Sequence, residues 1–341
     1  MLRAALRDLQ WRWKRFVIAM VGVALVFAMG LVMTGLSASF SLEVDRTLAA
    51  IDADVWAVSA DASGPFTSQV PVPAGVAGPD ASPVMVLRQT IAGAGPLADI
   101  IVVAVEPSRL GSPEATRGVD LDGSGQAVVD DALQVAGLGD TFSLGGSEFR
   151  VVGTVSGQRL YAGLPVVYIP LRDAQAMVVG GQDLATAFLF SAPPSSVPAG
   201  LKTMSNDDVK NDVLRPLRDA RSSIAFVRVL LWIVAATIIG SVLYLQAMER
   251  TRDFAVFKAT GTSTVEIGLG LALQAVVLSL AAAVLAALLA VLLAPLFPMH
   301  VEIPTSAFLL LPVVTVVVGL LASLVALRRT ATVQPALAFG G

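Results

Sequence analysis

Long apolar runs mark four segments of the chain that could cross a membrane. They cover residues 16–36, 229–247, 267–293 and 307–327. Each run is about 20 residues or longer, which lets a helix cross a hydrocarbon core of about 30 Å. A more polar stretch, residues 41–224, separates the first run from the second, whereas the last three runs follow one another closely. The pattern predicts one span, one large domain and then three spans.

Composition supports an integral membrane protein. Hydrophobic residues make up 55% of the 341 residues and charged residues 14%, and the mean hydropathy is +0.76. The absence of cysteine excludes disulfides and thiolate metal sites. A single histidine, His300, argues against catalytic triads and histidine-rich metal sites. With Glu302 nearby it forms a weak candidate metal or proton site, and we interpret the pair as solvated loop residues.

The first apolar run could also be a cleaved signal peptide, since Ser37, Ala38 and Ser39 form an acceptable small-residue cleavage site. The run is longer than the 7–15 apolar residues of an ordinary signal sequence, and a helical pattern continues after it. We therefore expect it to remain as a membrane anchor.

Basic residues set the expected orientation. They gather before the first span, after the second span (Arg250, Arg252 and Lys258) and at the end of the fourth (Arg328 and Arg329). By the positive-inside rule these regions face the cytoplasm. Residues 41–224 carry 12 basic and 21 acidic residues, a net charge of −9, and should lie outside. We expect a multi-pass protein of the cytoplasmic membrane with both termini inside.

The expected fold class is an α-helical membrane protein with four transmembrane helices (1+3) and a mixed α/β domain inserted between helices 1 and 2. The predicted segments run in chain order: cytoplasmic 1–15, helix 16–40, extracytoplasmic domain with stalk segments 41–224, helix 225–248, cytoplasmic loop 249–264, helix 265–294, outer loop 295–306, helix 307–328 and cytoplasmic tail 329–341.

Within the domain, β-rich runs bounded by Gly, Pro and Asp predict strands at 54–59, 100–105, 149–155 and 165–170. Gly145-Gly146 between two alternating apolar stretches predicts a hairpin within 139–155. Short helices are expected at 130–136 and 171–178, and loops at 61–83 and 191–200. On this interpretation Asp130 and Asp131 supply negative charge to the start of a helix.

Two amphipathic segments flank the domain. Apolar residues recur at about helical spacing after the first span and before the second, where Pro216 predicts a kink. We expect both helices to continue above the membrane as a stalk whose paired stripes couple domain and spans. Amphipathic connectors lying on lipid are the alternative. The stalk candidates are Phe40, Val44, Leu48, Val209, Val213 and Leu217.

The loop after the second span carries the strongest local pattern. A charged entry, two phenylalanines one turn apart and Gly261 predict a short helix on the membrane surface, ended by a left-handed glycine. Ser263 and Glu266 predict a capping box for the third span. The phenylalanines could bury in lipid or fill a groove on a soluble partner. The candidate coupling residues are Glu249, Arg250, Arg252, Asp253, Phe254, Phe257, Lys258 and Gly261.

Polar side chains inside the spans are few. Arg228 sits near an outer edge, from which it could reach the interface. We expect Thr237, Gln246, Gln274 and Thr315 to bond between helices. Four glycines should permit close helix approach, namely Gly22, Gly30, Gly35 and Gly240. No hydrophilic path through the spans is evident, which argues against an ion-coupled carrier.

The residues from Glu249 to Gly261 resemble the "ER-x-x-E-x-A-x-x-K-A-x-G" pattern of FtsX-like/MacB-type ABC transporter permeases, with Asp253 in place of the usual Glu. The tail from Arg328 to Leu337 resembles the family's closing motif. The stretch 139–153 resembles the hairpin of the MacB-like periplasmic core domain. The chain looks closest to actinobacterial permeases labelled as glutamine transporters, although ordinary amino-acid importers lack such a domain between spans.

This resemblance implies a homodimer that works with two copies of a cytoplasmic ABC ATPase docked on the 249–264 loop. ATP and Mg would bind to the ATPase, because this chain has no G-x-x-x-x-G-K-[ST] loop and no cofactor site of its own. Relatives of this type convert ATP hydrolysis into movement of the outer domain, called mechanotransmission. The expected function is extrusion of a hydrophobic or peptide-like substrate by a non-enzymatic subunit. Further expected partners are membrane lipids and an extracytoplasmic adaptor, lipoprotein or hydrolase, but no nucleic acid.

Three other functions remain open. An FtsX-type regulator would activate an extracytoplasmic cell-wall hydrolase without moving cargo, and a membrane sensor subunit would fit four spans and a medium-sized domain. An enzyme fits poorly, because the chain has no histidine pair, cysteine nucleophile, G-x-S-x-G or H-E-x-x-H motif.

Overall fold

The computed structural model describes residues 13–91, 97–249, 251, 255–256, 261–297 and 301–331. The chain divides into two compact units. The membrane unit comprises Met1–Ala38 and Ala220–Gly341, and the α/β unit comprises Ser39–Asp219.

Four long helices have the length and composition of membrane spans, which confirms the expected number. They are α2 (Trp13–Ile51), α5 (Arg218–Glu249), α7 (Thr264–Leu293) and α8 (Thr305–Ala331). A short 3-10 turn, η3 (Ala294–Leu296), follows α7. Helix α2 is continuous over 39 residues, so one uninterrupted helix belongs to the membrane unit up to Ala38 and to the α/β unit beyond it.

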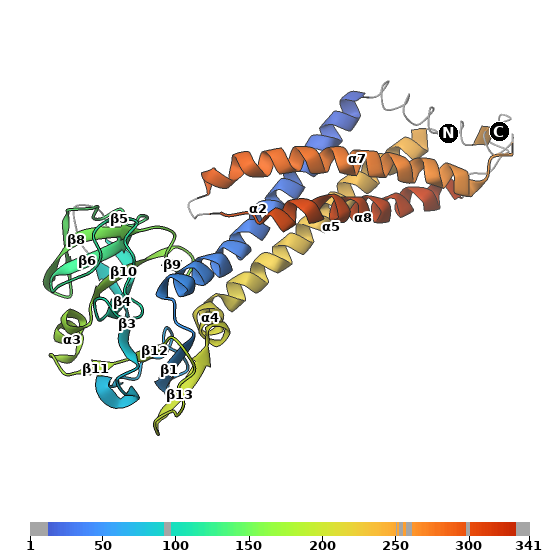
Figure 1. The fold of residues 1–341 in the computed structure, drawn as a ribbon. Coiled ribbons are helices and arrows are strands. Elements are labelled where there is room, and N and C mark those ends of the chain that lie inside the picture. The colour runs from blue at the N-terminus through green and yellow to red at the C-terminus, as the bar shows by residue number, and fades with distance from the viewer. Residues whose placement is uncertain are drawn as a thin grey trace. The chain divides into compact units, whose positions relative to one another are not determined.

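Small residues let the membrane helices approach closely, and α7 and α8 lie side by side (Figure 1). A methyl group on Gly240 would lie 3.5 Å from the carbonyl oxygen of Ala322, and one on Gly319 would collide with Ser279. One on Gly35 would come within 2.6 Å of Ile303. The close helix approach expected at Gly240 is confirmed, and it favours dispersion contacts between backbones. Gly35 lies close to residues that precede α8 and not to a helix. At Gly22 and Gly30 the expectation is wrong, since an added methyl group would meet no described atom closer than 4.0 Å.

In the described part of the chain, Thr237, Thr315 and Gln246 do not make the interhelical hydrogen bonds expected of them. Thr237 and Thr315 donate instead to carbonyls of their own helices, those of Ile233 (2.9 Å) and Pro312 (3.0 Å). Gln246 is 3% exposed and neither its amide nitrogen nor its amide oxygen has a partner. Hydroxyls satisfy themselves on the preceding turn because that acceptor is always within reach, whereas a glutamine side chain has no such local acceptor.

Proline and capping residues set the helix ends as predicted. Pro216 lies in a 3-10 turn, η2 (Arg215–Leu217), that separates α4 (Asn206–Leu214) from α5. Ser263 and Glu266 form the capping box at the start of α7. The φ angle of Gly261 is +93°, a positive value as expected, but most of the short helix that it was predicted to end lies outside the described residues.

The α/β unit is built on a mixed 11-stranded sheet in the order β13-β1-β12-β3-β4-β10-β6-β8-β5, with β7 paired to β8 and β9 to β10. Strands β2 and β11 form a separate ribbon, and η1 (Ala74–Ala77) follows β2. The strand bounds are β1 Val55–Ser59, β2 Val72–Pro73, β3 Ser82–Ile91, β4 Ala98–Val105, β5 Arg117–Gly118, β6 Gln126–Asp130, β7 Thr141–Leu144, β8 Ser147–Val155, β9 Arg159–Leu160, β10 Leu164–Pro170, β11 Leu184–Ala185, β12 Ala187–Phe190 and β13 Leu201–Ser205.

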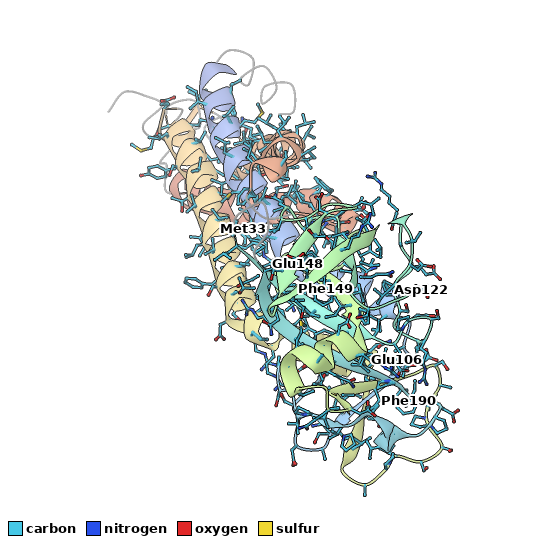
Figure 2. The ribbon with its side chains drawn as sticks, turned by 90° about the vertical axis from the view of Figure 1, so that its left-hand side faces the viewer. Met33, Glu106, Asp122, Glu148, Phe149 and Phe190 are labelled. Atoms are coloured by element: carbon cyan, nitrogen blue, oxygen red, sulfur yellow. The ribbon has the colours of Figure 1, made fainter. Side chains whose placement is uncertain are left out.

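Strand β3 joins the two halves of this sheet. Its first residues pair with β12 and its remainder, from Met85 to Ile91, pairs with β4. The larger apolar core lies under β3, β4, β6, β8 and β10 and is covered by α3 (Leu171–Val179). A smaller core forms around Phe188 and Phe190 of β12. Along β8, Phe149 is buried in the larger core and its neighbour Glu148 is exposed, as alternation on a strand requires (Figure 2).

The predicted hairpin is confirmed, with Phe142 opposite Phe149 on β7 and β8. Both turn residues, Gly145 and Gly146, have positive φ angles, 57° and 83°, as a type I′ turn requires. The strands predicted at 54–59, 100–105, 149–155 and 165–170 correspond to β1, β4, β8 and β10. The helix predicted at 171–178 corresponds to α3.

The helix predicted at 130–136 is wrong. Asp130 ends strand β6, and turns follow it as far as Gly137. The short apolar pattern was misleading because Val128 and Val129 are buried in strand β6. Asp130 continues this strand and is buried in an ion pair with Arg159. The explanation of Asp130 and Asp131 as helix N-terminal charges is therefore wrong as well.

Candidate functional site

The candidate stalk is the part of α2 from Ser39 to Ile51, together with α4. Five of the six apolar stalk candidates are buried, with exposures of 0–5%, namely Phe40, Val44, Leu48, Val209 and Val213. Leu217 is only half-buried, since it lies in the 3-10 turn where the helical stripe is interrupted. An ion pair of 2.6 Å between Lys210 and Asp45 shows that the two segments lie next to each other.

Helix α2 is tied to the sheet by Thr47. Its hydroxyl, fully buried, donates to the carbonyl of Glu43 on the same helix (3.0 Å) and to that of Arg159 on β9 (3.1 Å). A buried hydroxyl shared in this way fixes the rotation of the helix about its axis, because turning the helix would leave a polar group unsatisfied.

The side chain of Arg159 is held from the other side by a buried carboxylate. Asp130 is fully buried and accepts from Arg159 Nε at 2.9 Å and from the backbone N–H of Gln158 at 2.7 Å. Arg159 Nη2 also donates to Asp131 at 3.1 Å. Each oxygen of the Asp130 carboxylate therefore accepts a charge-assisted hydrogen bond. The buried carboxylate is a rigid anchor for β9.

Helix α4 is tied to the same region through Asp212, which is 1% exposed. Its carboxylate accepts from the backbone N–H groups of Phe66 (3.1 Å) and Thr67 (3.2 Å), and also from the Thr67 hydroxyl. The carbonyl of Phe66 in turn accepts a hydrogen bond of 2.9 Å from the hydroxyl of Tyr161. Tyr161 is the residue that directly follows β9. Both stalk helices are therefore linked by buried hydrogen bonds to residues 159–161.

Asn206 makes a second junction at the start of α4. It accepts from the indole N–H of the fully buried Trp56 (2.9 Å) and donates to the carbonyl of Ala53 (2.8 Å). Ser205 and Asp208 form a capping box at this end. The residues that follow α2 are thereby joined to the residues that begin α4.

Glu43 lies on α2 seven residues beyond the apolar run that ends at Leu36, within the α/β unit. It is 5% exposed, and its Oε2 has no hydrogen-bond partner. Burial raises the pKa of Glu43 to about 7, although Arg159 and a backbone N–H of Gly163 favour the ionised form. A carboxyl group that titrates near neutrality therefore lies on the helix that joins the two units.

A polar cavity of about 460 Å³ lies in the α/β unit where α2 ends. Asp52, Arg109, Glu114 and Gln158 are among its lining residues. Arg109 is held by Glu106 at 2.6 Å and by the carbonyl of Ala81 at 2.8 Å. Within the described residues, no three His, Asp or Glu side chains are arranged to hold a metal ion.

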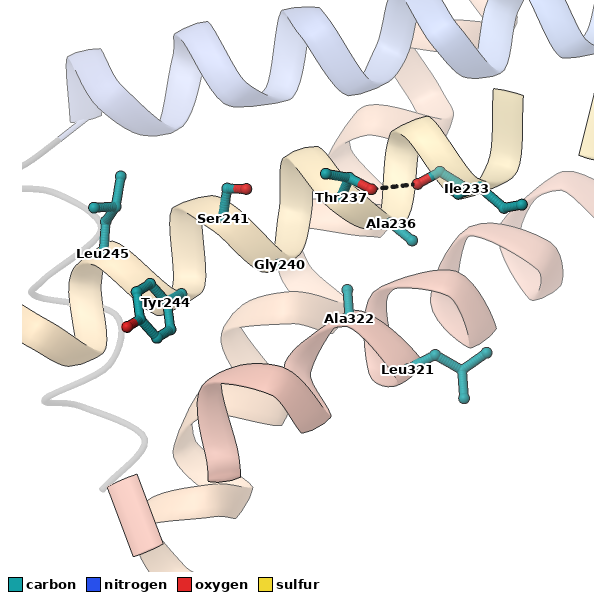
Figure 3. A pocket seen from close by; sticks show the side chains of 9 residues that line it. All are labelled: Ile233, Ala236, Thr237, Gly240, Ser241, Tyr244, Leu245, Leu321 and Ala322. Carbon is teal, nitrogen blue, oxygen red and sulfur yellow. Dashed lines mark hydrogen bonds between the residues drawn. The ribbon is translucent and has the colours of Figure 1, made fainter. Parts of the chain in front are cut away.

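The membrane unit has an apolar groove of about 780 Å³ between α5 and α8, lined by nine residues that include Gly240, Tyr244 and Ala322 (Figure 3). Helix α5 has the lowest buried share among the four spans, 22% against 33–50%. Its face toward the groove, with Ile233 at 56% and Leu245 at 44% exposure, is open to lipid or to another chain.

Most of the coupling segment lies outside the described residues, namely Arg250, Arg252, Asp253, Phe254, Phe257 and Lys258. Glu249 is the last residue of α5, and Gly261 precedes the capping box of α7. The coupling role of these eight residues remains a prediction.

Two known protein domains together match almost the whole chain. Residues 17–224 match the MacB-like periplasmic core domain, and residues 225–335 match the FtsX-like permease C-terminal domain. An ABC transporter permease of Mycobacterium tuberculosis is 42% identical over the whole of both chains, and a second from the same species is 41% identical over both. The chain belongs to the MacB/FtsX-type ABC transporter permeases.

A permease from Mycobacterium bovis is likewise 42% identical over both full chains. Among solved structures, the periplasmic region of MacB from Actinobacillus actinomycetemcomitans matches with 13% identity and a TM-score of 0.34, covering 50% of this permease and 97% of that chain. The two domain matches and the full-length relatives confirm the family resemblance predicted from the sequence, and the match to the MacB-like periplasmic core domain, together with the four long helices, confirms the fold class.

No local sequence pattern indicated the anchors that hold the stalk of the permease. Asp130 and Arg159 lie 29 residues apart, Thr47 and Arg159 lie 112 apart, and Thr67 and Asp212 lie 145 apart. The stalk candidates were identified from helical spacing alone. This spacing correctly indicated which helix faces are buried, but it did not indicate the polar residues that bind them to the sheet.

Proposed function

We propose that this permease acts by mechanotransmission in the cytoplasmic membrane, with both termini inside and the α/β unit outside. Two copies of the chain assemble with two copies of a cytoplasmic ABC ATPase, which binds ATP and Mg and docks on the segment 249–264. ATP hydrolysis then moves α2 and α5, and that movement reaches the α/β unit. The outcome is extrusion of a hydrophobic or peptide-like substrate.

One observation carries this proposal. Both stalk segments are fixed by buried hydrogen bonds to the same short stretch of the domain, through Thr47 to Arg159 and through Asp212 and Phe66 to Tyr161. Helix α2 is also unbroken from residue 13 to residue 51. A rigid helix clamped to a rigid domain transmits displacement, whereas flexible linkers would absorb it.

The polar cavity near Asp52 and Arg109 favours a second candidate function. Its lining is more polar than apolar and includes charged groups, so it suits a polar ligand or a protein loop better than a hydrophobic cargo. A regulator that changes the activity of an extracytoplasmic cell-wall hydrolase, without moving cargo, would use the α/β unit as a contact surface alone.

Co-purification with the cognate ATPase tests the assignment of the partner. The detergent-solubilised permease should retain the ATPase, and Phe254→Ala/Phe257→Ala should lose it because the docking aromatics are gone. Phe226→Ala, at a side chain 63% exposed on α5, is the matched control. Failure of the wild type to bind any ATPase would reject the ABC mechanism and favour a sensor subunit.

Proteoliposomes containing the permease and its ATPase separate export from regulation. ATP-dependent efflux of a dansylated hydrophobic peptide would support the exporter. ATP-dependent activation of an added cell-wall hydrolase, with no efflux, would support the regulator.

A further inference from the structure

Arg228 lies at the edge of a cavity of about 230 Å³ within the membrane unit. Helices α2, α5 and α8 all contribute to its lining. Leu31, Leu311 and Val314 belong to its apolar wall, and Leu310, 60% exposed, leaves the cavity accessible from the lipid side. Among the described residues that line this cavity, Arg228 alone carries a charge.

Among the described residues, the guanidinium group has no anionic partner. Its Nε is buried and makes no hydrogen bond, and in the described part of the chain no carboxylate forms an ion pair with it. One nitrogen, Nη1, lies 3.4 Å from the Thr34 hydroxyl, whose proton is already donated to the carbonyl of Gly30 at 2.8 Å. The ring of Trp232 lies 5.7 Å from the Arg228 guanidinium carbon.

The positively charged guanidinium of Arg228, with its buried Nε, would be stabilised by a bound anion. An arginine within a membrane span is costly unless it pairs or reaches water, and such residues are usually functional. If Arg228 only extended to the membrane interface, its whole guanidinium group would be hydrated. Here, however, the Nε atom of Arg228 is buried away from solvent. A weak contact with a neutral hydroxyl and an aromatic face offsets only part of that cost.

We propose that this cavity is a binding site for a phospholipid of the surrounding bilayer. The phosphate binds the Arg228 guanidinium, which matches phosphate geometry with two parallel N–H donors. The first part of one acyl chain lies along Leu31, Leu311 and Val314. This site goes beyond the proposed function, since it needs neither the ATPase nor a cargo.

Native mass spectrometry of the full-length permease, delipidated in detergent, tests the site with three probes: dioleoylphosphatidylglycerol, dioleoylglycerol and inorganic phosphate. Wild type should bind the phospholipid at least about tenfold more tightly than dioleoylglycerol, because charge-assisted bonds to phosphate are absent from the latter. Arg228→Gln should lower phospholipid affinity to the dioleoylglycerol level. Arg221→Gln, with the same charge change two turns earlier on α5, should bind like wild type.

Two results would overturn the lipid site: Arg228→Gln retaining wild-type affinity, or dioleoylglycerol binding as tightly as the phospholipid. Inorganic phosphate binding as tightly as the lipid would also reject a phospholipid as the occupant. Should Arg228→Gln fail to fold, Leu310→Trp carries the test. It fills the lipid-facing side of the cavity and should reduce phospholipid binding with Arg228 in place, and unchanged binding would contradict the proposal.

Discussion

The two units of this permease treat buried polar groups in opposite ways. In the α/β unit, Asp130, Asp212 and Thr47 are almost fully buried and each makes at least two hydrogen bonds. In the membrane unit, Gln246, Ser279 and Arg228 all have buried polar atoms with no partner. Glu43, on the helix shared by both units, is the exception in the α/β unit.

This difference follows from how each unit gains its stability. The α/β unit folds in water, where an unpaired buried charge would cost several kcal/mol, so its buried charges are matched. The membrane unit packs through small residues such as Gly240 and Gly319, and its polar atoms do not hold it together. Of its unpartnered groups, Arg228 lines a cavity, whereas Gln246 and Ser279 are almost fully buried.

Removal of Arg159 should have the largest effect. Arg159→Met leaves the buried Asp130 carboxylate unpaired and should destabilise the α/β unit by about 3–5 kcal/mol. Hydrogen exchange of β6 and β10 during urea titration of the nanodisc-embedded permease measures this. Arg150→Met, at an exposed position on β8, should cost less than about 0.5 kcal/mol. A loss below about 1 kcal/mol for Arg159→Met would contradict the anchor.

Glu43 should make stability depend on pH. Its folded pKa of about 7 lies above the ordinary 4.5, so its contribution is fully present below pH 4.5 and is lost as pH rises toward 7. Glu43→Gln should remove this dependence and stabilise the α/β unit at pH 8 by up to about 3 kcal/mol. Unfolding midpoints of both proteins between pH 5 and 8 give the comparison, and parallel profiles would show that Glu43 does not titrate here.

Gln246→Leu should stabilise the membrane unit by about 1–2 kcal/mol, because an unpartnered amide is replaced by an apolar group of similar size. Thermal unfolding in detergent measures the change. Gln89→Leu, in the α/β unit, serves as the matched substitution outside the membrane unit. A marked destabilisation by Gln246→Leu would mean that this amide has a partner in the assembled complex. Gln246 would then not be an unpaired polar group of the membrane unit.

The ion pair between Asp45 and Lys210 should contribute least. Its side chains are 49% and 28% exposed, and surface pairs contribute about 0–1 kcal/mol. Asp45→Asn should thus shift the unfolding midpoint slightly and lose that shift at high salt. A loss as large as that of Arg159→Met would show that the two stalk helices depend on each other and not on their anchors.

Sequence reasoning located what depends on local patterns. Apolar runs predicted the spans, two glycines predicted the hairpin, Pro216 predicted the break before α5, and Ser263 with Glu266 predicted a cap. It failed at 130–136, where a distant arginine determines the conformation of Asp130. Strand β3, which joins the two halves of the sheet, was also missed, since its buried and exposed ends do not follow one alternation.

The central claim is that the stalk carries ATP-driven movement into the α/β unit. The chain has no cysteine, so Val197→Cys, in a loop of that unit and 40% exposed, places one spin label per chain. Pulsed electron paramagnetic resonance on the complex with its ATPase then reports the distance between the two copies. Trapping with ATP and vanadate should shift this distance in wild type and in the control Thr203→Val/Asp207→Asn. The shift should be lost in Thr47→Val/Asp212→Asn, with ATPase binding unchanged. An identical shift in the stalk variant, or none in wild type, would contradict mechanotransmission through these anchors.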